Sequence, residues 1–193
     1  MKNLLKGISF LLIASPKFKA LARIFKREEE FKILDVGCGN HSPVMTKKYF
    51  PKCYYYGIDK DIYNYDEEDK IAMDEFYRLD LEKTDLSVLE EDFFDAIILN
   101  HVIEHLHNGL ELIKNLTKKL KSKGIIYIEF PSERSLFLPT MKGTLNFFDD
   151  PTHVKIYTIA EINVILFADN FNILKLGVRR DIPKALLTPF TFL

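Results

Sequence analysis

Short apolar runs recur along this chain, and each is bounded by charged or turn-forming residues. Runs of about four to eight apolar residues are typical of strands that are buried inside a sheet. We therefore predict six strands, in the segments Ile33–Val36, Cys53–Ile58, Phe76–Leu79, Phe94–Leu99, Gly124–Phe130 and Phe171–Val178.

The first predicted strand runs directly into a Gly-x-Gly turn that starts at Gly37. Glycine suits such a turn because it lacks a Cβ, so the backbone bends tightly and a ligand can approach it. Asp35 lies two residues before that glycine, and Ser42 and Pro43 suit the N-cap and first turn of a following helix. The segment predicts a cradle for a nucleotide-type cofactor at the mouth of a parallel sheet.

Carboxylates also stand at the ends of later predicted strands. Asp59 ends the second strand, where a ribose diol could donate two hydrogen bonds to it, and Asp80 follows the third. A single acidic strand end would be an ordinary solvated cap. Three of them, counting Asp35, in register with a Gly-x-Gly turn favour a binding site.

The segments ILDVGCG, GIDK, RLDLEK, FDAIILNHVIEHL and GIIYIEFPS resemble the successive motifs of class I S-adenosylmethionine-dependent methyltransferases. The resemblance covers residues 31–178 in the order and spacing of the family. It implies an α/β, Rossmann-like domain whose mostly parallel sheet is flanked by helices, with strand order 3-2-1-4-5 followed by the late strand. It also implies S-adenosyl-L-methionine as the cofactor.

The same resemblance assigns cofactor contacts by position. Asp35 and the glycines would line the methionine portion, and Asp59 would bind the ribose hydroxyls. Asp80 would bind the adenine amino group, Leu81 would cover the adenine face, and Asn100 would lie beside the sulfonium. The full predicted set is Asp35, Gly37, Cys38, Gly39, Asp59, Lys60, Asp80, Leu81 and Asn100.

One departure from the family pattern is His41-Ser42, which stands where many members have a third glycine. Ser42 is small, so we expect the turn to survive, and we expect His41 to be a turn residue only. A nicotinamide dinucleotide fits less well, because its fingerprint requires a glycine at Ser42 and leaves Asp35 without a role.

Four side chains are candidates for catalysis. Methyl transfer to a hydroxyl requires a group that accepts its proton. His101, Glu104 and His105 are predicted at the start of the helix after the fourth strand, and their spacing puts His101 on the face of the other two. His153 follows the fifth strand. We predict that these four residues carry out the chemistry and that His153 matters for turnover.

The same residues partly resemble a metal-dependent branch of the family, the small-RNA 2′-O-methyltransferases and the ubiquinone-biosynthesis O-methyltransferases. That branch has an E-x-x-E-H motif and a later histidine, and here His101 stands in place of the first glutamate. A Glu-His pair also shapes the pocket in members without a known metal. We expect that no metal is required.

Residues 1–30 are predicted to form a helical lid on a methyltransferase domain that spans 31–193. Apolar residues recur there at helical spacing among lysines and arginines, so a basic amphipathic segment resting on an anionic membrane is the alternative. The apolar tail Ile182–Leu193 could be a strand or a membrane-facing patch. No apolar run is long enough for a transmembrane helix.

Charge and cysteine content narrow the functional classes. The 27 Lys and Arg nearly balance the 28 Asp and Glu, so nucleic acid is not an expected partner. Two cysteines cannot form a disulfide framework, so we expect a protein of the reducing cytoplasm.

An aromatic segment, Pro131–Pro151, is expected to bind the acceptor. The predicted function is methyl transfer to a small-molecule, lipid-linked or saccharide-linked acceptor, on oxygen; the alternative is a regulatory protein that binds S-adenosylmethionine without catalysis.

Overall fold

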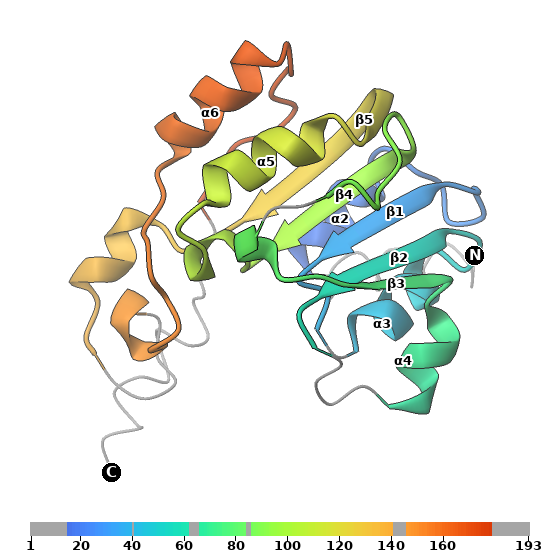
Figure 1. Ribbon diagram of the computed structural model, residues 1–193, viewed down its shortest axis with the longest axis horizontal. Coiled ribbons are helices and arrows are strands. Elements are labelled where there is room, and N and C mark those ends of the chain that lie inside the picture. The colour runs from blue at the N-terminus through green and yellow to red at the C-terminus, as the bar shows by residue number, and fades with distance from the viewer. Residues whose placement is uncertain (1–14, 40, 62–65, 84–85, 141–145, 179–193) are drawn as a thin grey trace, which may run out of the picture. The chain divides into compact units, whose positions relative to one another are not determined.

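The computed structural model describes residues 15–39, 41–61, 66–83, 86–140 and 146–178 (Figure 1). The chain divides into two compact units, Met1–Asn100 with Asn115–Glu129, and His101–Lys114 with Phe130–Leu193. The first unit contains the sheet, and the second contains the predicted catalytic residues. The apolar positions of residues 1–14 and the predicted tail segment lie outside the described residues.

Within the described residues, the sheet has five parallel strands in the order β3-β2-β1-β4-β5. The strand arrows in Figure 1 point the same way. This arrangement confirms the predicted Rossmann-like fold and strand order. The strands are β1 (Lys32–Val36), β2 (Tyr54–Asp59), β3 (Glu75–Arg78), β4 (Phe94–Asn100) and β5 (Leu120–Glu129).

The central strands are apolar on both faces because both faces are buried. Ile33 and Leu34 of β1 are adjacent and have no exposed surface, and Ile97 and Ile98 of β4 are equally buried. Parallel strands covered on both sides read as continuous apolar runs, which explains why the sequence pattern identified them.

The described part of the first unit contains, in chain order, the helices α2 (Pro16–Leu21), α3 (Ser42–Tyr49) and α4 (Glu67–Ala72). Phe18 of α2 stacks on Tyr49 of α3 with 4.1 Å between the ring centroids. Both rings belong to one apolar cluster that also includes residues of β1, β2 and β4. Helices α2 and α3 therefore cover the same face of the sheet.

The region after β4 differs from the predicted helix start. Only one 3₁₀ turn, η2 (Ile103–His105), forms there, and the α-helix α5 (Gly109–Thr117) begins later. The carbonyl of Glu104 accepts hydrogen bonds from the backbone N–H groups of Val154 and Lys155, at 2.9 and 3.2 Å. That carbonyl is engaged by another segment, so the helical ladder does not continue from it.

The predicted sixth strand is wrong. Residues 171–178 form no strand in the structure, and Leu174 and Leu176 are 72% and 57% exposed. The segment has apolar residues, but the structure buries neither of its faces.

Strand β5 begins at Leu120, four residues before the predicted start, and Lys121 in this added part pairs with Asp95 at 2.8 Å.

In the second unit, helix α6 (Ile159–Ala168) starts with a capping box. The Thr158 hydroxyl accepts from the Glu161 N–H, and the Glu161 carboxylate accepts from the Thr158 N–H at 2.8 Å. The hydrogen bond from the Thr158 backbone N–H first, and then that from the Thr158 hydroxyl to Glu161 Oε2 at 2.9 Å, lower the pKa of Glu161. No helix in the described part of the chain is long and apolar enough to cross a membrane.

Tyr157 joins two segments of the second unit. Its hydroxyl accepts from the backbone N–H of Gly109 at 3.0 Å and donates to the carbonyl of Leu106 at 2.5 Å. The side chain is 1% exposed, so both backbone groups depend on it.

Replacing Tyr157 by Phe should lower the free energy of unfolding by about 1–3 kcal/mol, because two buried backbone groups lose their partner. Urea denaturation would measure this loss. Tyr54→Phe is the control, since Tyr54 is 44% exposed, and it should leave stability within about 0.5 kcal/mol of wild type. Equal stability of the two variants would contradict the role of the Tyr157 hydroxyl.

Candidate functional site

The Gly-x-Gly turn adopts the conformation that its glycines allow. Gly37 and Gly39 have φ values of 63° and 53°, in the left-handed region where residues with a Cβ are strained. The Cys38 N–H donates to the carbonyl of Ile58 at 3.0 Å, and the Gly39 N–H donates to Asp59 Oδ2 at 3.0 Å. A Cβ built on Gly39 meets no atom within 4 Å, so the turn is open to a ligand.

The acidic strand ends lie together beside this turn. Asp59 Oδ1 accepts from the Lys60 N–H at 2.7 Å, and the Asp59 carbonyl accepts from the Leu79 N–H at 3.0 Å, directly before Asp80. Lys60 Nζ lies 3.8 Å from Asp80 Oδ2. The Glu82 N–H above all, and then the nearby lysines, lower the pKa of Asp80, so this carboxylate is charged at neutral pH.

The remaining predicted contacts lie at the same edge of the sheet. Leu81 begins the 3₁₀ turn η1 (Leu81–Lys83) and is buried. Asn100 ends β4, and the register pairs Val36 with Leu99, so Asn100 and Gly37 follow neighbouring positions on adjacent strands. The sheet therefore brings the first and fourth strand ends to one place.

Asp35 is buried under the turn. Its Oδ2 accepts hydrogen bonds from the Ser42 hydroxyl at 2.5 Å and the Tyr55 hydroxyl at 2.9 Å, and Lys17 Nζ lies at 3.3 Å. Burial first, and then the charge of Asp35, raise the pKa of Tyr55 well above its usual value, so Tyr55 remains a donor. Asp35 thus supports the turn from beneath.

Two points here were not predicted from sequence. Ser42 is not the N-cap of α3; the cap residue is His41, at φ 62°, and Ser42 directs its hydroxyl to Asp35. Lys17 is 11% exposed at its side chain and also donates to Ser42 Oγ at 2.6 Å. A sequence pattern shows Lys17 only as one of several basic residues in the N-terminal segment, because nothing local marks its distant partner.

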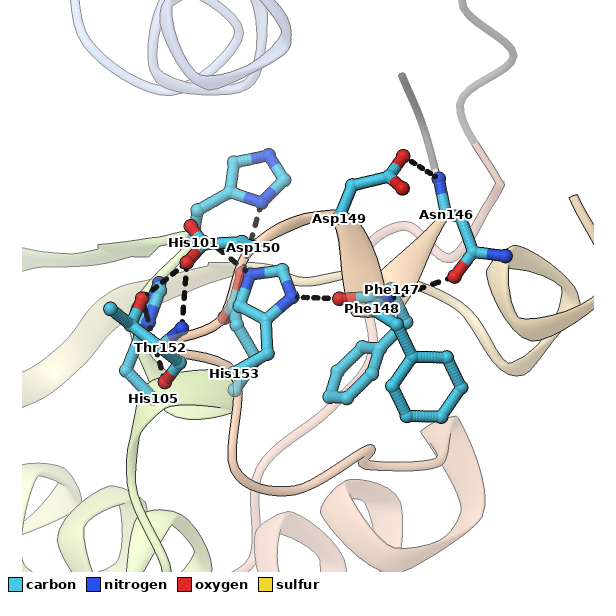
Figure 2. A network of polar contacts seen from close by, with 10 residues as sticks. His101, His105, Asn146, Phe147, Phe148, Asp149, Asp150, Thr152 and His153 are labelled. Atoms are coloured by element: carbon cyan, nitrogen blue, oxygen red, sulfur yellow. Dashed lines mark hydrogen bonds and ion pairs between the residues drawn. The ribbon is translucent and has the colours of Figure 1, made fainter. Parts of the chain in front are cut away.

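The second unit brings the predicted catalytic residues together (Figure 2). One side-chain ligand atom from each of Glu104, His105 and His153 lies within 4.8 Å of the other two. His101 has φ 56° and lies outside the 3₁₀ turn, so it shares no helical face with Glu104. Its Nδ1 nevertheless lies 3.1 Å from Glu104 Oε1.

Backbone carbonyls determine which nitrogen carries the proton in two of these imidazoles. His153 Nδ1 lies 2.7 Å from the carbonyl of Phe147, and His105 Nδ1 lies 3.2 Å from that of Thr152. A carbonyl can only accept, so both Nδ1 atoms donate. In the neutral rings, both Nε2 atoms are therefore the ones that can accept a proton or bind a metal.

Two carboxylates complete this group. Glu104 is 1% exposed, and its Oε2 has no hydrogen-bond partner among the described residues. Asp150 accepts from the hydroxyl and backbone N–H of Thr152, and these bonds are the main cause of its lowered pKa. Asp150 Oδ2 also lies 3.9 Å from His153 Nε2.

Comparison with known proteins establishes the family. The model of the methyltransferase domain family matches residues 11–176. The chain belongs to this family. Its fold is that of class I S-adenosylmethionine-dependent methyltransferases, and S-adenosylmethionine is the cofactor of this class.

Individual relatives extend this finding. The chain is 33% identical over 100 residues to the ubiquinone biosynthesis O-methyltransferase of Rickettsia bellii, a match that covers 51% of this chain and 41% of that protein. The structure resembles an S-adenosylmethionine-dependent methyltransferase from Archaeoglobus fulgidus, with TM-score 0.60, 20% identity, and coverage of 90% and 82% of the two chains. It also resembles the CurJ carbon methyltransferase, with TM-score 0.58, 16% identity, and coverage of 88% and 49%. These two structures show the fold alone.

The residues of the methyltransferase domain fit this cofactor. The turn is open above Gly39, and the carboxylates of Asp59, at the end of β2, and Asp80, just after β3, can accept from ribose hydroxyls and the adenine amino group. That the nine residues named from the sequence contact the cofactor stays a prediction.

Replacing Asp59 by Ala should weaken S-adenosylmethionine binding by about 2–3 kcal/mol, because hydrogen bonds to a charged acceptor are lost. Calorimetric titration would measure the change. Asp61→Ala is the matched control, since Asp61 pairs with Arg78 on the surface, and it should bind like wild type. Unchanged affinity in Asp59→Ala would exclude the proposed ribose contact.

Replacing Lys17 by Met should lower the free energy of unfolding by about 3 kcal/mol, because the buried Asp35 carboxylate loses its only cationic partner among the described residues. Adding Asp35→Asn should restore part of that loss. Lys26→Met, at an exposed position of the same segment, should be neutral in the same urea titration. A Lys17→Met variant as stable as the control would contradict the buried ion pair.

Proposed function

We propose that this chain transfers a methyl group from S-adenosylmethionine to a hydroxyl oxygen of a small-molecule, lipid-linked or saccharide-linked acceptor. The observation that carries the proposal is the pair of imidazoles, His105 and His153, whose Nδ1–H groups both donate to backbone carbonyls. In the neutral rings, each Nε2 atom then carries the lone pair that can accept a proton. A hydroxyl that attacks a methyl group must lose a proton, and a neutral imidazole is the usual acceptor at neutral pH.

S-adenosylmethionine supplies its own leaving group, so the protein has to bind, align and exclude water. In this proposal the Gly-x-Gly turn and Asp59 hold the cofactor, and Asp80 and Leu81 hold its adenine. His153 accepts the hydroxyl proton at Nε2. Asp150, ionised and 3.9 Å from that atom, stabilises the positive charge that results.

The name of the Rickettsia bellii relative supports transfer to oxygen. The chain spans 41% of the length of that relative, so the acceptor class is inferred from the site as well as from the name. Exposed aromatic side chains of the second unit support an apolar or aromatic acceptor. Phe137 of η3 (Glu133–Phe137) and Phe148 of η4 (Phe147–Asp149) are 87% and 67% exposed, and both lie in the predicted acceptor-binding segment.

Glu104, His105 and His153 also fit a divalent cation. Among the residues that the structure describes, the buried Glu104 Oε2 has no hydrogen-bond partner, which is costly unless a cation or donor is present. Each imidazole has its second nitrogen fixed by a carbonyl, as is typical of metal-binding histidines. A bound cation would lower the pKa of an acceptor hydroxyl. This is the second candidate for the same residues, and it differs from the metal-free site that the sequence favoured.

The N-terminal segment is proposed to pack on the domain as part of the cofactor site. Lys17, Phe18 and Leu21 of α2 are all buried. A helix that buries these residues in its own domain does not present them to a membrane, so the described part of the segment supports the lid over peripheral membrane contact.

Replacing His153 by Ala should reduce turnover by roughly 10²-fold or more, with S-adenosylmethionine affinity near wild type, because the proton acceptor is lost. Product formation on a panel of hydroxyl acceptors, together with calorimetric titration, would measure both quantities. His107→Ala is the control, because His107 is outside the cluster, and it should retain activity. Full activity in His153→Ala would make this histidine structural. Cofactor binding by the wild-type chain without turnover would identify a regulatory binding protein instead.

A chelator separates the two candidates for the cluster. If His153 acts as a base alone, wild-type activity at saturating S-adenosylmethionine should be unchanged in chelator. If a cation is needed, activity should vanish, return with added divalent ion, and fail to return in Glu104→Gln, because three ligands become two. This variant preserves side-chain size, so its loss of rescue would report on the ligand.

A further inference from the structure

A second group of metal-ligating side chains lies in the first unit, away from the residues assigned to chemistry. It consists of His41, Asp66 and Asp69. His41 is the N-cap of α3, Asp66 is the N-cap of α4, and Asp69 lies in the first turn of α4. One ligand atom from each residue lies within 4.8 Å of the others.

The distances favour an ion between these atoms over direct hydrogen bonds. His41 Nδ1 lies 3.7 Å from Asp69 Oδ2 and 3.9 Å from Asp66 Oδ2, both too long for a hydrogen bond. Ligands that are each about 2.1 Å from a tetrahedral ion are separated by about 3.4 Å. The observed gaps are therefore close to the spacing of an ion's ligands and need only a small contraction.

Asp69 supplies an independent reason for a cation. Its side chain has no exposed surface, and its Oδ1 has no hydrogen-bond partner among the described residues. Its Oδ2 accepts from the His41 N–H at 2.8 Å, so the carboxylate is directed to this group. A buried carboxylate oxygen without a partner is costly, and a cation bound by both oxygens of Asp69 would remove that cost.

The local backbone leaves the second carboxylate available. Asp66 accepts the Asp69 N–H on Oδ1 at 2.8 Å, as a helix cap does, and its Oδ2 faces His41. His41 is held at φ 62° by the turn, and its side chain is 66% exposed, so an ion can enter from solvent.

We propose that His41, Asp66 and Asp69 bind a divalent transition-metal ion, with a solvent molecule in the remaining position. One imidazole with two carboxylates suits Zn²⁺ or Mn²⁺ better than Mg²⁺, which prefers oxygen ligands and retains its water. The ion joins the start of α4 to the residue two positions after Gly39. It thereby holds the glycine turn in the shape that binds S-adenosylmethionine.

The test uses Zn²⁺ as the probe and a parent chain that carries His105→Gln and His153→Gln, which removes the imidazoles of the other cluster. Calorimetric titration of this parent should show one saturable Zn²⁺ site, with Mg²⁺ at least tenfold weaker. Adding His41→Asn or Asp66→Asn should weaken Zn²⁺ binding roughly tenfold or more. Asparagine tolerates the left-handed backbone at position 41 and caps a helix at position 66, so both variants should fold.

His107→Gln in the same parent is the matched control and should retain the Zn²⁺ site, since His107 belongs to neither cluster. Circular dichroism would verify that each variant is folded. A parent without a saturable site, or equal Zn²⁺ affinity after His41→Asn and Asp66→Asn, would overturn the proposed site. Equal Mg²⁺ affinity would overturn the transition-metal class.

The effect on the turn has its own readout. S-adenosylmethionine affinity of the parent should rise severalfold with saturating Zn²⁺, and this increase should disappear in Asp66→Asn. An affinity that does not depend on Zn²⁺ would overturn the link between the ion and the glycine turn. Because the parent lacks the imidazoles of His105 and His153, on which the proposed proton transfer rests, this result is independent of whether the chain methylates oxygen.

Discussion

The cofactor side of this methyltransferase domain depends on a single buried carboxylate. Asp35 Oδ2 accepts from Ser42 and Tyr55 and faces the ammonium of Lys17. One atom thereby connects β1, β2, α2 and α3. A buried carboxylate is costly unless charge and hydrogen bonds compensate it, so this arrangement strongly disfavours a different placement of α2 or of the glycine turn.

The parallel register provides the second constraint. Because β1 lies between β2 and β4, the ends of these strands meet at one edge of the sheet. There the Gly39 backbone N–H donates to the Asp59 carboxylate, which also accepts from the backbone N–H of Lys60. The turn is thus supported by Asp35 from beneath and by Asp59 from the side. The proposed ion at His41 would add a third support immediately after the glycines.

The second unit organises its polar residues differently. The imidazoles of His105 and His153 are oriented by backbone carbonyls, and the backbone carbonyl of Glu104 accepts from the N–H groups of residues 154 and 155. Because these hydrogen bonds occupy the Glu104 carbonyl, the 3₁₀ helix stops after a single turn. The geometry that prevents a longer helix therefore also brings the segment of His153 to Glu104.

The sequence by itself determined the five strands of the sheet and the Gly-x-Gly turn, because buried parallel strands and glycines at positive φ leave strong local patterns. Its motifs also indicated the family, and the strand order followed from that resemblance. It also predicted His101, Glu104, His105 and His153 as catalytic residues. The structure groups the last three, and their roles stay a prediction. It did not reveal Lys17 as the partner of Asp35, the group of His41 with Asp69, or that residues 171–178 form no strand. These features join residues that are 18 and 28 positions apart, or depend on whether a face is covered, and only the tertiary structure decides such contacts.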